Sequence, residues 1–364
     1  MKKKTVMIAG GGTGGHIYPA VAIARALLEK DPSLDIHFVG SPGGFETKII
    51  PKEGFPLHLI RVGKLNQTGG LFGKIKTLLR IPMALLQATA LLFELKPQFV
   101  LGVGGYASGP FVLMASLLGF KTTIWEPNAH PGLTNRWLSF FVRRSLVVFE
   151  EAGKLLKSKH IVQIGIPVRK EVEEMIAGNH SDEKFHLLIF GGSQGARAIN
   201  KVVQETILKY SAELKDIDVV HQTGPHDIAE AKQSYEKLSP SFAEAHEYLY
   251  GMEKYYQWAD LVICRSGAST VAELAACGMP AVLIPLPWAA DNHQLKNAQS
   301  LVDHDAGILL EQKDLTPEVL LKKILELKND KKQRELMKLN LKKFYKPKAA
   351  YRIAEYLLTV GEAV

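Results

Sequence analysis

The sequence predicts an α/β protein made of two doubly wound domains, each a parallel sheet covered by helices on both faces. Three observations support this fold class. Short apolar runs alternate with helical patterns, the alternation restarts after residue 180, and glycine-rich segments follow several of the apolar runs. Continuous apolar strands separated by helices are typical of parallel sheets that are buried on both faces. The length of 364 residues is sufficient for two such domains.

In the first half, the alternation of strand and helix begins almost at once. A helix is expected over 19–30, because Ala20, Ile23 and Leu27 repeat at helical spacing. Strands are expected where short apolar runs end at glycine or polar residues. The predicted strands cover 6–9, 36–40, 99–103 and 122–125, and a second helix covers 111–118.

The second half repeats this pattern. Its predicted strands cover 187–190, 218–222, 261–264 and 281–284, and its first helices cover 198–210 and 270–277. The segment Gly165-Ile-Pro-Val-Arg169 and the polar stretch 178–184 interrupt the alternation between the halves. We therefore expect one domain over 1–165 and another over 166–347. An amphipathic C-terminal helix, 348–364, is able to pack back on the first domain.

Charge is distributed unevenly between the two halves. Residues 1–165 carry 20 basic and 9 acidic side chains, a net charge of +11, whereas 166–364 carry 25 and 28, a net charge of −3. This asymmetry favours an anionic partner for the first half, such as a phosphate-bearing ligand, nucleic acid or lipid. Solvated surface lysines are the alternative. No nucleic-acid-binding motif is recognisable, which disfavours a nucleic-acid partner.

Composition narrows the class further. Cys264 and Cys277 lie in apolar segments without metal-ligand spacing, which favours a reduced, cytoplasmic protein without a zinc site. The apolar run 5–9 behind the N-terminal lysines is too short for a secretion signal. The uncharged run 81–93 is shorter than the ~20 residues that span a bilayer. We expect this run to form a helix that is buried against the sheet.

Three glycine clusters each follow a predicted strand and precede a predicted helix. They are Gly10-Gly-Gly-Thr-Gly-Gly-His16, Gly104-Gly-Tyr-Ala-Ser-Gly-Pro110 and Gly191-Gly-Ser-Gln-Gly-Ala196. Glycine lets the main chain turn tightly and approach a ligand, and the free N–H groups of the following helix favour an anion. One such loop is weak evidence, because tight turns use glycine for packing alone. Three loops in matching positions predict phosphate-bearing ligands.

The first cluster also matches the dinucleotide fingerprint at Gly10, Gly12 and Gly15. That fingerprint requires an acidic residue at the end of the next strand to bind the ribose. Here the next strand ends in Phe38-Val-Gly-Ser41, and Asp35 precedes it. A dinucleotide is therefore disfavoured. A P-loop ATPase is excluded, because no GxxxxGK[S/T] occurs.

A further polar cluster, Arg265-Ser-Gly-Ala-Ser-Thr-Val-Ala-Glu273, follows a predicted strand directly. Arg265 supplies charge, Ser269 and Thr270 offer hydroxyl groups at a helix start, and Glu273 could accept both hydroxyls of a ribose. The alternative is a helix-capping arrangement with a surface glutamate. Downstream, Asp291-Asn-His-Gln294 lies in another loop at the carboxyl end of a strand, where open α/β sheets bind ligands.

Taken together, the segments 10–16, 104–110, 191–196, 265–273 and 291–298 resemble the MurG family of glycosyltransferases. The match spans nearly the whole chain in the right order. It implies a GT-B glycosyltransferase fold, two Rossmann-like domains facing a central cleft. It also implies inverting transfer of N-acetylglucosamine from UDP-N-acetylglucosamine to lipid I, an undecaprenyl-diphosphate-linked MurNAc-peptide. The product is lipid II for peptidoglycan, made at the cytoplasmic face of the inner membrane without a cofactor.

The resemblance implies site residues one by one. Asn128 belongs to a segment associated with the binding site, Leu249 marks a main-chain contact to the uracil, and Glu273 would bind the ribose. Gln294 would reach the sugar. The other donor contacts that it implies are Thr13, Gly14, Gly15, Arg169, Ser193, Ala268, Ser269, Thr270, Val271 and Ala272.

The proposed reaction requires a base for the acceptor hydroxyl. His16 is the candidate, because imidazole titrates near neutrality and the family has its candidate base there. The alternative is that His16 only caps or packs at the helix start. Glu126 is a lesser candidate, as a base or as a group that orients the acceptor. The Asp-x-Asp pairs at 216–218 and 303–305 do not follow convincing strands, so we expect solvated charges and no metal site.

A lipid-linked acceptor requires contact with a membrane. Basic and apolar residues mingle over 61–80, which favours binding to an anionic membrane surface through that segment. Two departures from the family pattern leave the acceptor less certain than the donor. Trp125-Glu-Pro127 stands where the family reads His-Glu-Gln, and Ile166 where it reads Asn. The alternatives are another glycolipid glycosyltransferase of the same fold, a sugar-nucleotide epimerase and a lipid-binding module.

Overall fold

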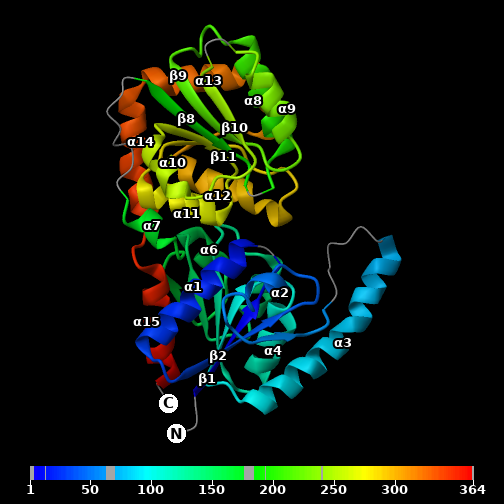
Figure 1. Cartoon of the computed structure of the whole chain (residues 1–364). Helices are drawn as coiled ribbons and strands as arrows, with labels where there is room; N and C mark the ends of the chain where they lie inside the picture. The colour runs from blue at the N-terminus through cyan, green and yellow to red at the C-terminus, as the bar shows by residue number, and fades with distance from the viewer. Residues whose placement is uncertain are drawn as a thin grey trace. The chain divides into compact units, whose positions relative to one another are not determined.

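The structure, a computed structural model, describes residues 4–12, 14–62, 70–175, 184–192, 194–238 and 241–362. The chain forms two compact units, each with its own sheet (Figure 1). Unit 1 comprises Met1–Pro167 and Lys348–Val364, and unit 2 comprises Val168–Pro347. The predicted boundary, between 165 and 166, lies two residues before the observed one.

Unit 1 is built on a parallel sheet with the strand order β3-β2-β1-β4-β5-β6-β7. Its strands are β1 (Lys4–Gly10), β2 (Leu34–Gly40), β3 (Leu57–Leu59), β4 (Phe99–Gly104), β5 (Lys121–Glu126), β6 (Arg144–Val147) and β7 (His160–Gln163). Its helices are α1 (Gly14–Lys30), α2 (Glu46–Ile49), α3 (Gly70–Leu95), α4 (Ser108–Leu117), α5 (Leu133–Leu138), α6 (Glu150–Leu155) and α15 (Ala349–Glu362). The strand order reverses between β1 and β4, which pair with each other in parallel.

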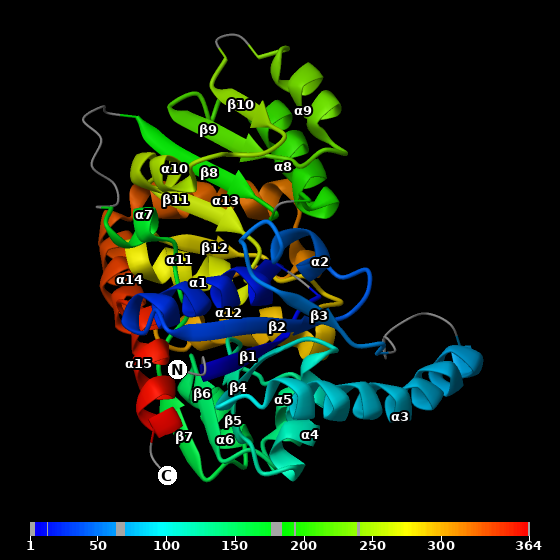
Figure 2. The ribbon, with the colours of Figure 1, turned by 60° about the horizontal axis from the view of Figure 1, so that its bottom comes forward.

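The core of unit 1 lies between its sheet and the helices that pack against the sheet. Met7 and Ala9 of β1 belong to an apolar cluster that includes Leu92 of α3 and Phe111 of α4. On another side, α1 packs beside the C-terminal helix α15, as Figure 2 also shows. The side chain of Tyr351 in α15 hydrogen-bonds Glu29 in α1. The C-terminal helix thus belongs to the same unit as the first strand.

Helix α3 differs from the expectation for residues 81–93. It runs without interruption through Pro82, and its N-terminal part extends beyond α4 in both ribbon views (Figures 1 and 2). One stripe is buried, including Ala84, Ala88 and Leu92. The opposite stripe is exposed: Met83 is 52% exposed, Leu86 66% and Phe93 57%. The prediction of a buried helix was therefore wrong for this stripe, because only one side of α3 finds a partner in unit 1.

Unit 2 is a second parallel sheet, with the order β10-β9-β8-β11-β12-β13. Its strands are β8 (Phe185–Phe190), β9 (Ile217–Gln222), β10 (Ala243–His246), β11 (Leu261–Cys264), β12 (Ala281–Leu283) and β13 (Ile308–Leu309). Its helices are α7 (Lys170–Glu173), α8 (Arg197–Lys209), α9 (Ile228–Tyr235), α10 (Met252–Trp258), α11 (Ala268–Cys277), α12 (His293–Val302), α13 (Pro317–Asn329) and α14 (Lys331–Phe344).

The apolar core of unit 2 joins β8 and β9 to α8, α9 and α13, through residues such as Ile189, Val203 and Ile324. The strand order reverses between β8 and β11. In an open α/β sheet, ligands bind beyond the carboxyl ends of the strands at such a reversal. Each unit therefore has one position of this kind, between β1 and β4 in unit 1 and between β8 and β11 in unit 2.

Candidate functional site

A pocket of unit 2 lies at this reversal of strand order. It has a volume of about 730 Å³, within the range of pockets that bind small ligands. The pocket is lined by the third glycine cluster, the start of α8, the residues after β11 and the loop after β12. The lining residues include Gly191, Gly192, Gly195, Lys201, Arg265, Thr270, Leu286, Trp288, Gln294 and Gln312.

The third glycine cluster forms the turn between β8 and α8. Gly195 has φ of 75°, and a Cβ atom there would lie 1.8 Å from the carbonyl oxygen of Thr223. Only glycine allows this contact, so the loop is pressed against the end of β9. Helix α8 then begins at Arg197, and its positive N-terminal end favours an anion in the pocket. Ser193, an implied donor contact, lies outside the described residues.

Three cations line the pocket in two different settings. The side chains of Arg197 and Lys201, on the first turns of α8, are 91% and 76% exposed. Arg265 is buried and donates to the carbonyl oxygens of Ile284 and Pro285 and to Oε1 of Gln312, at 3.0, 2.9 and 2.7 Å. Burial lowers the pKa of Arg265 to about 10, so the guanidinium stays charged at neutral pH. Arg265 therefore links the residues of the pocket wall and places a positive charge on the pocket.

Glu273, on α11, is held by Arg169, the N-cap residue of α7, and by Tyr256 of α10. Nε of Arg169 donates to its Oε1 at 2.9 Å, and the hydroxyl group of Tyr256 donates to its Oε2 at 3.0 Å. Burial raises the pKa of Glu273, and Arg169 and Tyr256 oppose that shift by stabilising the carboxylate. Two of the predicted residues, Arg169 and Glu273, are thus brought together in unit 2. Tyr256 was missed, because nothing in its sequence context points to this contact.

The start of α11 tests the capping alternative for 265–273. The helix begins at Ala268, and its N-cap residue, Gly267, has no side-chain cap hydrogen bond. Within the described chain, the capping arrangement is therefore not formed. Thr270 lines the pocket, and Ser269 lies beside it in the first turn. The side chains of Val271 and Ala272 are buried in unit 2, which leaves their main chain for any ligand contact.

A buried glutamine that sequence reasoning missed links two predicted ligand-binding segments. Nε2 of Gln222 donates to the carbonyl oxygen of Gly192 at 2.9 Å, and its Oε1 accepts from the main-chain N–H of Leu249 at 3.1 Å. Gln222 is 3% exposed. It therefore sets the spacing between the glycine loop and the segment expected to contact the uracil. No sequence signal marks this residue, because the link depends on two separate loops.

The loop before α12 carries backbone strain. Asp291 and Asn292 have φ of 52° and 53°, in the left-handed region, without being glycine. Strain of this kind persists only where the surrounding structure holds it, and it clusters at functional sites. Gln294 follows on α12, where its Oε1 accepts from the N–H of Leu286 at 3.0 Å and where it lines the pocket. Trp288, which is 73% exposed, lies on the same pocket.

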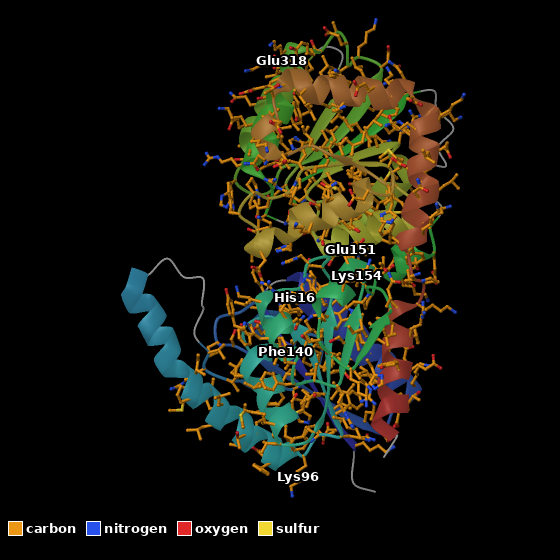
Figure 3. The ribbon with its side chains drawn as sticks, turned by 180° about the vertical axis from the view of Figure 1, so that it is seen from behind. His16, Lys96, Phe140, Glu151, Lys154 and Glu318 are labelled. Atoms are coloured by element: carbon orange, nitrogen blue, oxygen red, sulfur yellow. The ribbon has the colours of Figure 1, made fainter. Side chains whose placement is uncertain are left out.

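In unit 1, the first two glycine clusters contact each other at the reversal of strand order. The N–H of Gly11 donates to the carbonyl oxygen of Gly104 at 3.2 Å. A Cβ atom on Gly105 would lie 2.3 Å from the carbonyl oxygen of Gly11. His16, labelled in Figure 3, lies in the first turn of α1, and its ring packs against Gly104. Gly14 and Gly15 begin the same helix, and Thr13 lies outside the described residues.

Glu126 is 2% exposed and holds the loop that follows β5. Its Oε1 accepts from N and Nδ2 of Asn128, at 3.0 and 3.1 Å. Its Oε2 accepts from the N–H of Gly132 and from Nδ2 of Asn135, at 3.1 and 2.9 Å. Burial raises the pKa of Glu126, and these hydrogen bonds oppose that shift. Two roles were predicted for Glu126, as a base or as a group that orients the acceptor. The arrangement suits the second role, because both carboxylate oxygens accept hydrogen bonds from the protein.

The two departures from the family pattern lie next to each other. Trp125 is fully buried, and its Nε1 donates to the carbonyl oxygen of Gly165 at 3.2 Å. Ile166 is 4% exposed. Both changes are therefore in the interior of unit 1 and part of one packing arrangement. Neither side chain is available to select an acceptor directly.

Other predicted features can be placed from the structure. Cys264 and Cys277 are buried and free, as expected. The pair 216–218 lies at the amino end of β9, where Asp218 forms an ion pair with Lys184 at 2.9 Å, so it is remote from the pocket end of that strand. Across the described ranges, no group of three or more His, Cys, Asp or Glu side chains is arranged to hold a metal ion.

A doubly wound unit with a glycine loop, cations and a helix N-terminus around one pocket belongs to the class of Rossmann-like α/β proteins. Comparison with known families refines this class. The glycosyltransferase family 28 N-terminal domain matches residues 6–147, and the family 28 C-terminal domain matches residues 186–353. The chain therefore belongs to glycosyltransferase family 28.

Individual relatives cover almost the whole chain. A protein of Bdellovibrio bacteriovorus, named UDP-N-acetylglucosamine--N-acetylmuramyl-(pentapeptide) pyrophosphoryl-undecaprenol N-acetylglucosamine transferase, is 53% identical over 98% of this chain and 99% of its own. A protein of the same name from Myxococcus xanthus is 40% identical over 96% of this chain and 91% of its own. The crystal structure of Acinetobacter baumannii MurG matches with a TM-score of 0.81 and 29% identity, covering 98% of this chain and 99% of that one.

Proposed function

We propose that this protein transfers N-acetylglucosamine from UDP-N-acetylglucosamine to the 4-hydroxyl group of the MurNAc of lipid I, forming lipid II for peptidoglycan synthesis. The observation that carries the proposal is the 53% identity with the Bdellovibrio bacteriovorus transferase along nearly the full length of both chains. The family domains and the MurG crystal structure support the same reaction. The interior position of Trp125 and Ile166 supports lipid I as the acceptor, because the departures do not alter a ligand-facing side chain.

Unit 2 holds the donor in this proposal. The diphosphate lies at the N-terminus of α8, beside Arg197 and Lys201 and the loop that contains Ser193. Glu273 accepts the ribose hydroxyl groups, since each carboxylate oxygen can accept more than one hydrogen bond. The main chain at Leu249 contacts the uracil, and Gln294 contacts the sugar. Arg169 and the segment 268–272 complete the predicted contacts in unit 2. Thr13, Gly14, Gly15 and Asn128 are the predicted contacts in unit 1.

The chemistry is a single displacement. His16 removes the proton from the acceptor 4-hydroxyl group as that oxygen attacks C1 of the sugar. The bond between C1 and the diphosphate oxygen breaks, UDP leaves with the electron pair, and the configuration at C1 inverts. The cations and helix end of unit 2 stabilise the charge that develops on the leaving group. Glu126 holds the Asn128 loop and so orients the acceptor.

The protein acts on a lipid substrate, and we place it peripherally on the cytoplasmic face of the inner membrane. No helix among the described residues is both long and apolar enough to span a membrane. The predicted membrane segment, 61–80, falls mainly on residues 63–69 and on side chains of 70–80 that lie outside the description. The exposed stripe of Met83, Leu86 and Phe93 on the same helix supports this contact. Phe140, labelled in Figure 3, is a further exposed aromatic residue of unit 1.

The test of the reaction uses purified protein, radiolabelled UDP-N-acetylglucosamine and a short-chain lipid I analogue in detergent. The expected products are a labelled disaccharide lipid and UDP. Retained UDP-N-acetylglucosamine binding without transfer to lipid I would instead favour another glycolipid acceptor. Membrane contact is tested separately, by sedimentation with anionic vesicles at low and high salt. Replacement of Lys64, Lys74 and Lys76 by glutamine should reduce binding and leave transfer in detergent intact.

A further inference from the structure

A buried carboxylate occupies the first glycine loop of unit 1. Glu46, on α2, is 1% exposed. Its Oε2 accepts from the N–H of Gly12 at 2.8 Å, and its Oε1 accepts from the N–H and the hydroxyl group of Ser41 at 2.9 and 3.0 Å. A main-chain N–H of the kind that could bind a phosphate is therefore already bonded to the protein itself.

The glycines around Glu46 are explained by this contact. A Cβ atom on Gly11 would lie 2.3 Å from Cδ of Glu46, on Gly40 2.5 Å from its Cγ, and on Gly44 2.2 Å from its Oε2. Real Cβ atoms do not approach other atoms so closely. These positions come from two separate loops, after β1 and after β2. The glycines make room for the protein's own carboxylate, without requiring a bound phosphate.

The same loop leads to His16. Gly11 is also hydrogen-bonded to Gly104, and Gly105 packs on Gly11. A Cβ atom on Gly104 would lie 3.0 Å from Cε1 and 3.1 Å from Nδ1 of His16. The imidazole ring thus rests on the second glycine loop, and the first loop is clamped between that loop and Glu46. Moving the first loop would move the start of α1, which carries His16.

We propose that Glu46 is a positioning residue for the transfer reaction: it takes the anion position of the first glycine loop and so fixes the His16 ring against Gly104. This inference rests on the proposed role of His16 as the base. It also implies that the acceptor diphosphate does not bind at the N–H of Gly12. That diphosphate must bind elsewhere in unit 1, because the Glu46 carboxylate would repel it at this position.

The test compares Glu46→Ala, Glu46→Gln and Gly44→Ala in the full-length protein. Glu46→Ala should lower kcat by about 100-fold, the loss that a shift of about 1 Å in a catalytic group can cause. The KM for UDP-N-acetylglucosamine should change much less than kcat, since most of the predicted donor contacts lie in unit 2. Formate should restore part of the kcat of Glu46→Ala, because it replaces the missing carboxylate. Glu46→Gln keeps the shape of the side chain but loses one acceptor. Its kcat should therefore lie between those of Glu46→Ala and the wild-type protein.

Glu53→Ala is the matched control. Glu53 lies seven residues further on in unit 1, and its side chain pairs with Arg25. It should leave kcat unchanged. Should Glu46→Ala fail to fold, Gly44→Ala displaces the carboxylate without removing it, and the same loss of kcat is expected.

A readout that does not depend on transfer separates this inference from the proposed function. In protein with labelled histidines, the His16 signal is assigned by its loss in His16→Ala. Glu46→Gln should shift that signal, and Glu53→Ala should not. An unshifted signal, an unchanged kcat in Glu46→Ala, or a loss that formate does not restore would overturn the role of Glu46. Failure of the wild-type protein to transfer to any lipid would overturn the proposed function instead.

Discussion

The two units place the same local structure, a strand, a glycine loop and a helix, at the reversal of strand order, but they fill it differently. In unit 1, the carboxylate of Glu46 accepts the N–H of Gly12 inside the loop. In unit 2, the corresponding loop opens on a pocket of about 730 Å³ lined by Arg197, Lys201 and Arg265. One loop is filled by the protein, and the other lines the pocket in which we propose that the diphosphate binds.

This comparison shows what a glycine loop in a sequence does and does not indicate. Glycine marks a place where another group can approach the main chain closely. It does not say whether that group comes from a ligand or from the protein. The three glycine clusters of this chain predicted three anion sites, whereas the first is already paired with Glu46 and the second packs on the first.

The largest expected effect is on the chemistry assigned to unit 1. His16→Ala should lower kcat by about 10²–10⁴-fold, the usual contribution of a general base, while the affinity for UDP-N-acetylglucosamine stays the same. His160→Ala, at the exposed strand β7 of the same unit, is the control and should change neither quantity. Steady-state kinetics with the lipid I analogue provide the measurement. An equal loss of donor affinity in His16→Ala would contradict the assignment of the base to unit 1 and of the donor to unit 2.

The next largest effect is expected on donor binding in unit 2. Glu273→Gln should raise the KM for UDP-N-acetylglucosamine by about 10–100-fold, because a hydrogen bond to a charged group contributes about 1.5–3 kcal/mol. The kcat at saturating donor should change little. Glu230→Gln, on the surface of α9, serves as the control. A donor KM that stays at the wild-type value would remove Glu273 from the ribose site and leave it as the structural partner of Arg169.

A smaller effect on the same site is expected from Gln222. Replacing it by leucine removes two neutral hydrogen bonds, to Gly192 and Leu249, and should weaken UDP binding by about 5–10-fold. Gln204→Leu is the matched control, because Gln204 is also buried in unit 2 but bonds to Ser234 on α9. Titration calorimetry with UDP measures both variants. Equal weakening in the two variants would point to a general loss of packing.

Much of the fold could be predicted from the sequence. Parallel strands that are buried on both faces appear in a sequence as continuous apolar runs, so they can be recognised without knowledge of the tertiary structure. The predicted strand 261–264 coincides with β11, and the predicted helix 270–277 begins two residues after the observed start at Ala268. Helix α3 was harder to predict. Its apolar residues repeat on two sides, and a sequence does not show which side finds a partner.

The site was predictable where one segment carries the chemistry and not where separate segments meet. Arg265, Thr270 and Gln294 lie on the pocket as their loops suggested. Gln222 and Glu46 have no local signature, because each acts on main-chain atoms of other loops. The ion pair of Arg169 with Glu273 joins residues 104 positions apart, and the sequence pattern predicted only separate ligand contacts for them.

The last prediction concerns the stability of unit 2 and not the reaction, and it rests on His221, which lies in the core behind the glycine loop. Nδ2 of Asn200, on α8, donates to the carbonyl oxygen of Thr223 and to Asp227, so its Oδ1 is an acceptor. Nε2 of His221 therefore carries the hydrogen and donates to that Oδ1, and Nδ1 accepts from the hydroxyl group of Tyr235. This network joins the end of β9 to the helix whose N-terminus lines the pocket.

Burial lowers the pKa of His221 from 6.5 to about 3. Between these values the unfolded chain binds a proton that the folded chain does not, so acid favours unfolding. The free energy of unfolding of unit 2 should fall by about 1.4 kcal/mol for each unit that the pH drops below 6.5.

Hydrogen exchange of the β9 amides measures this dependence. His221→Gln, which is neutral at all these pH values, should flatten it, whereas His226→Gln at an exposed position should not. A steep dependence that persists in His221→Gln would assign the acid sensitivity to other groups. The hydrogen bonds that join Asn200 to the end of β9 would then not depend on the protonation of His221.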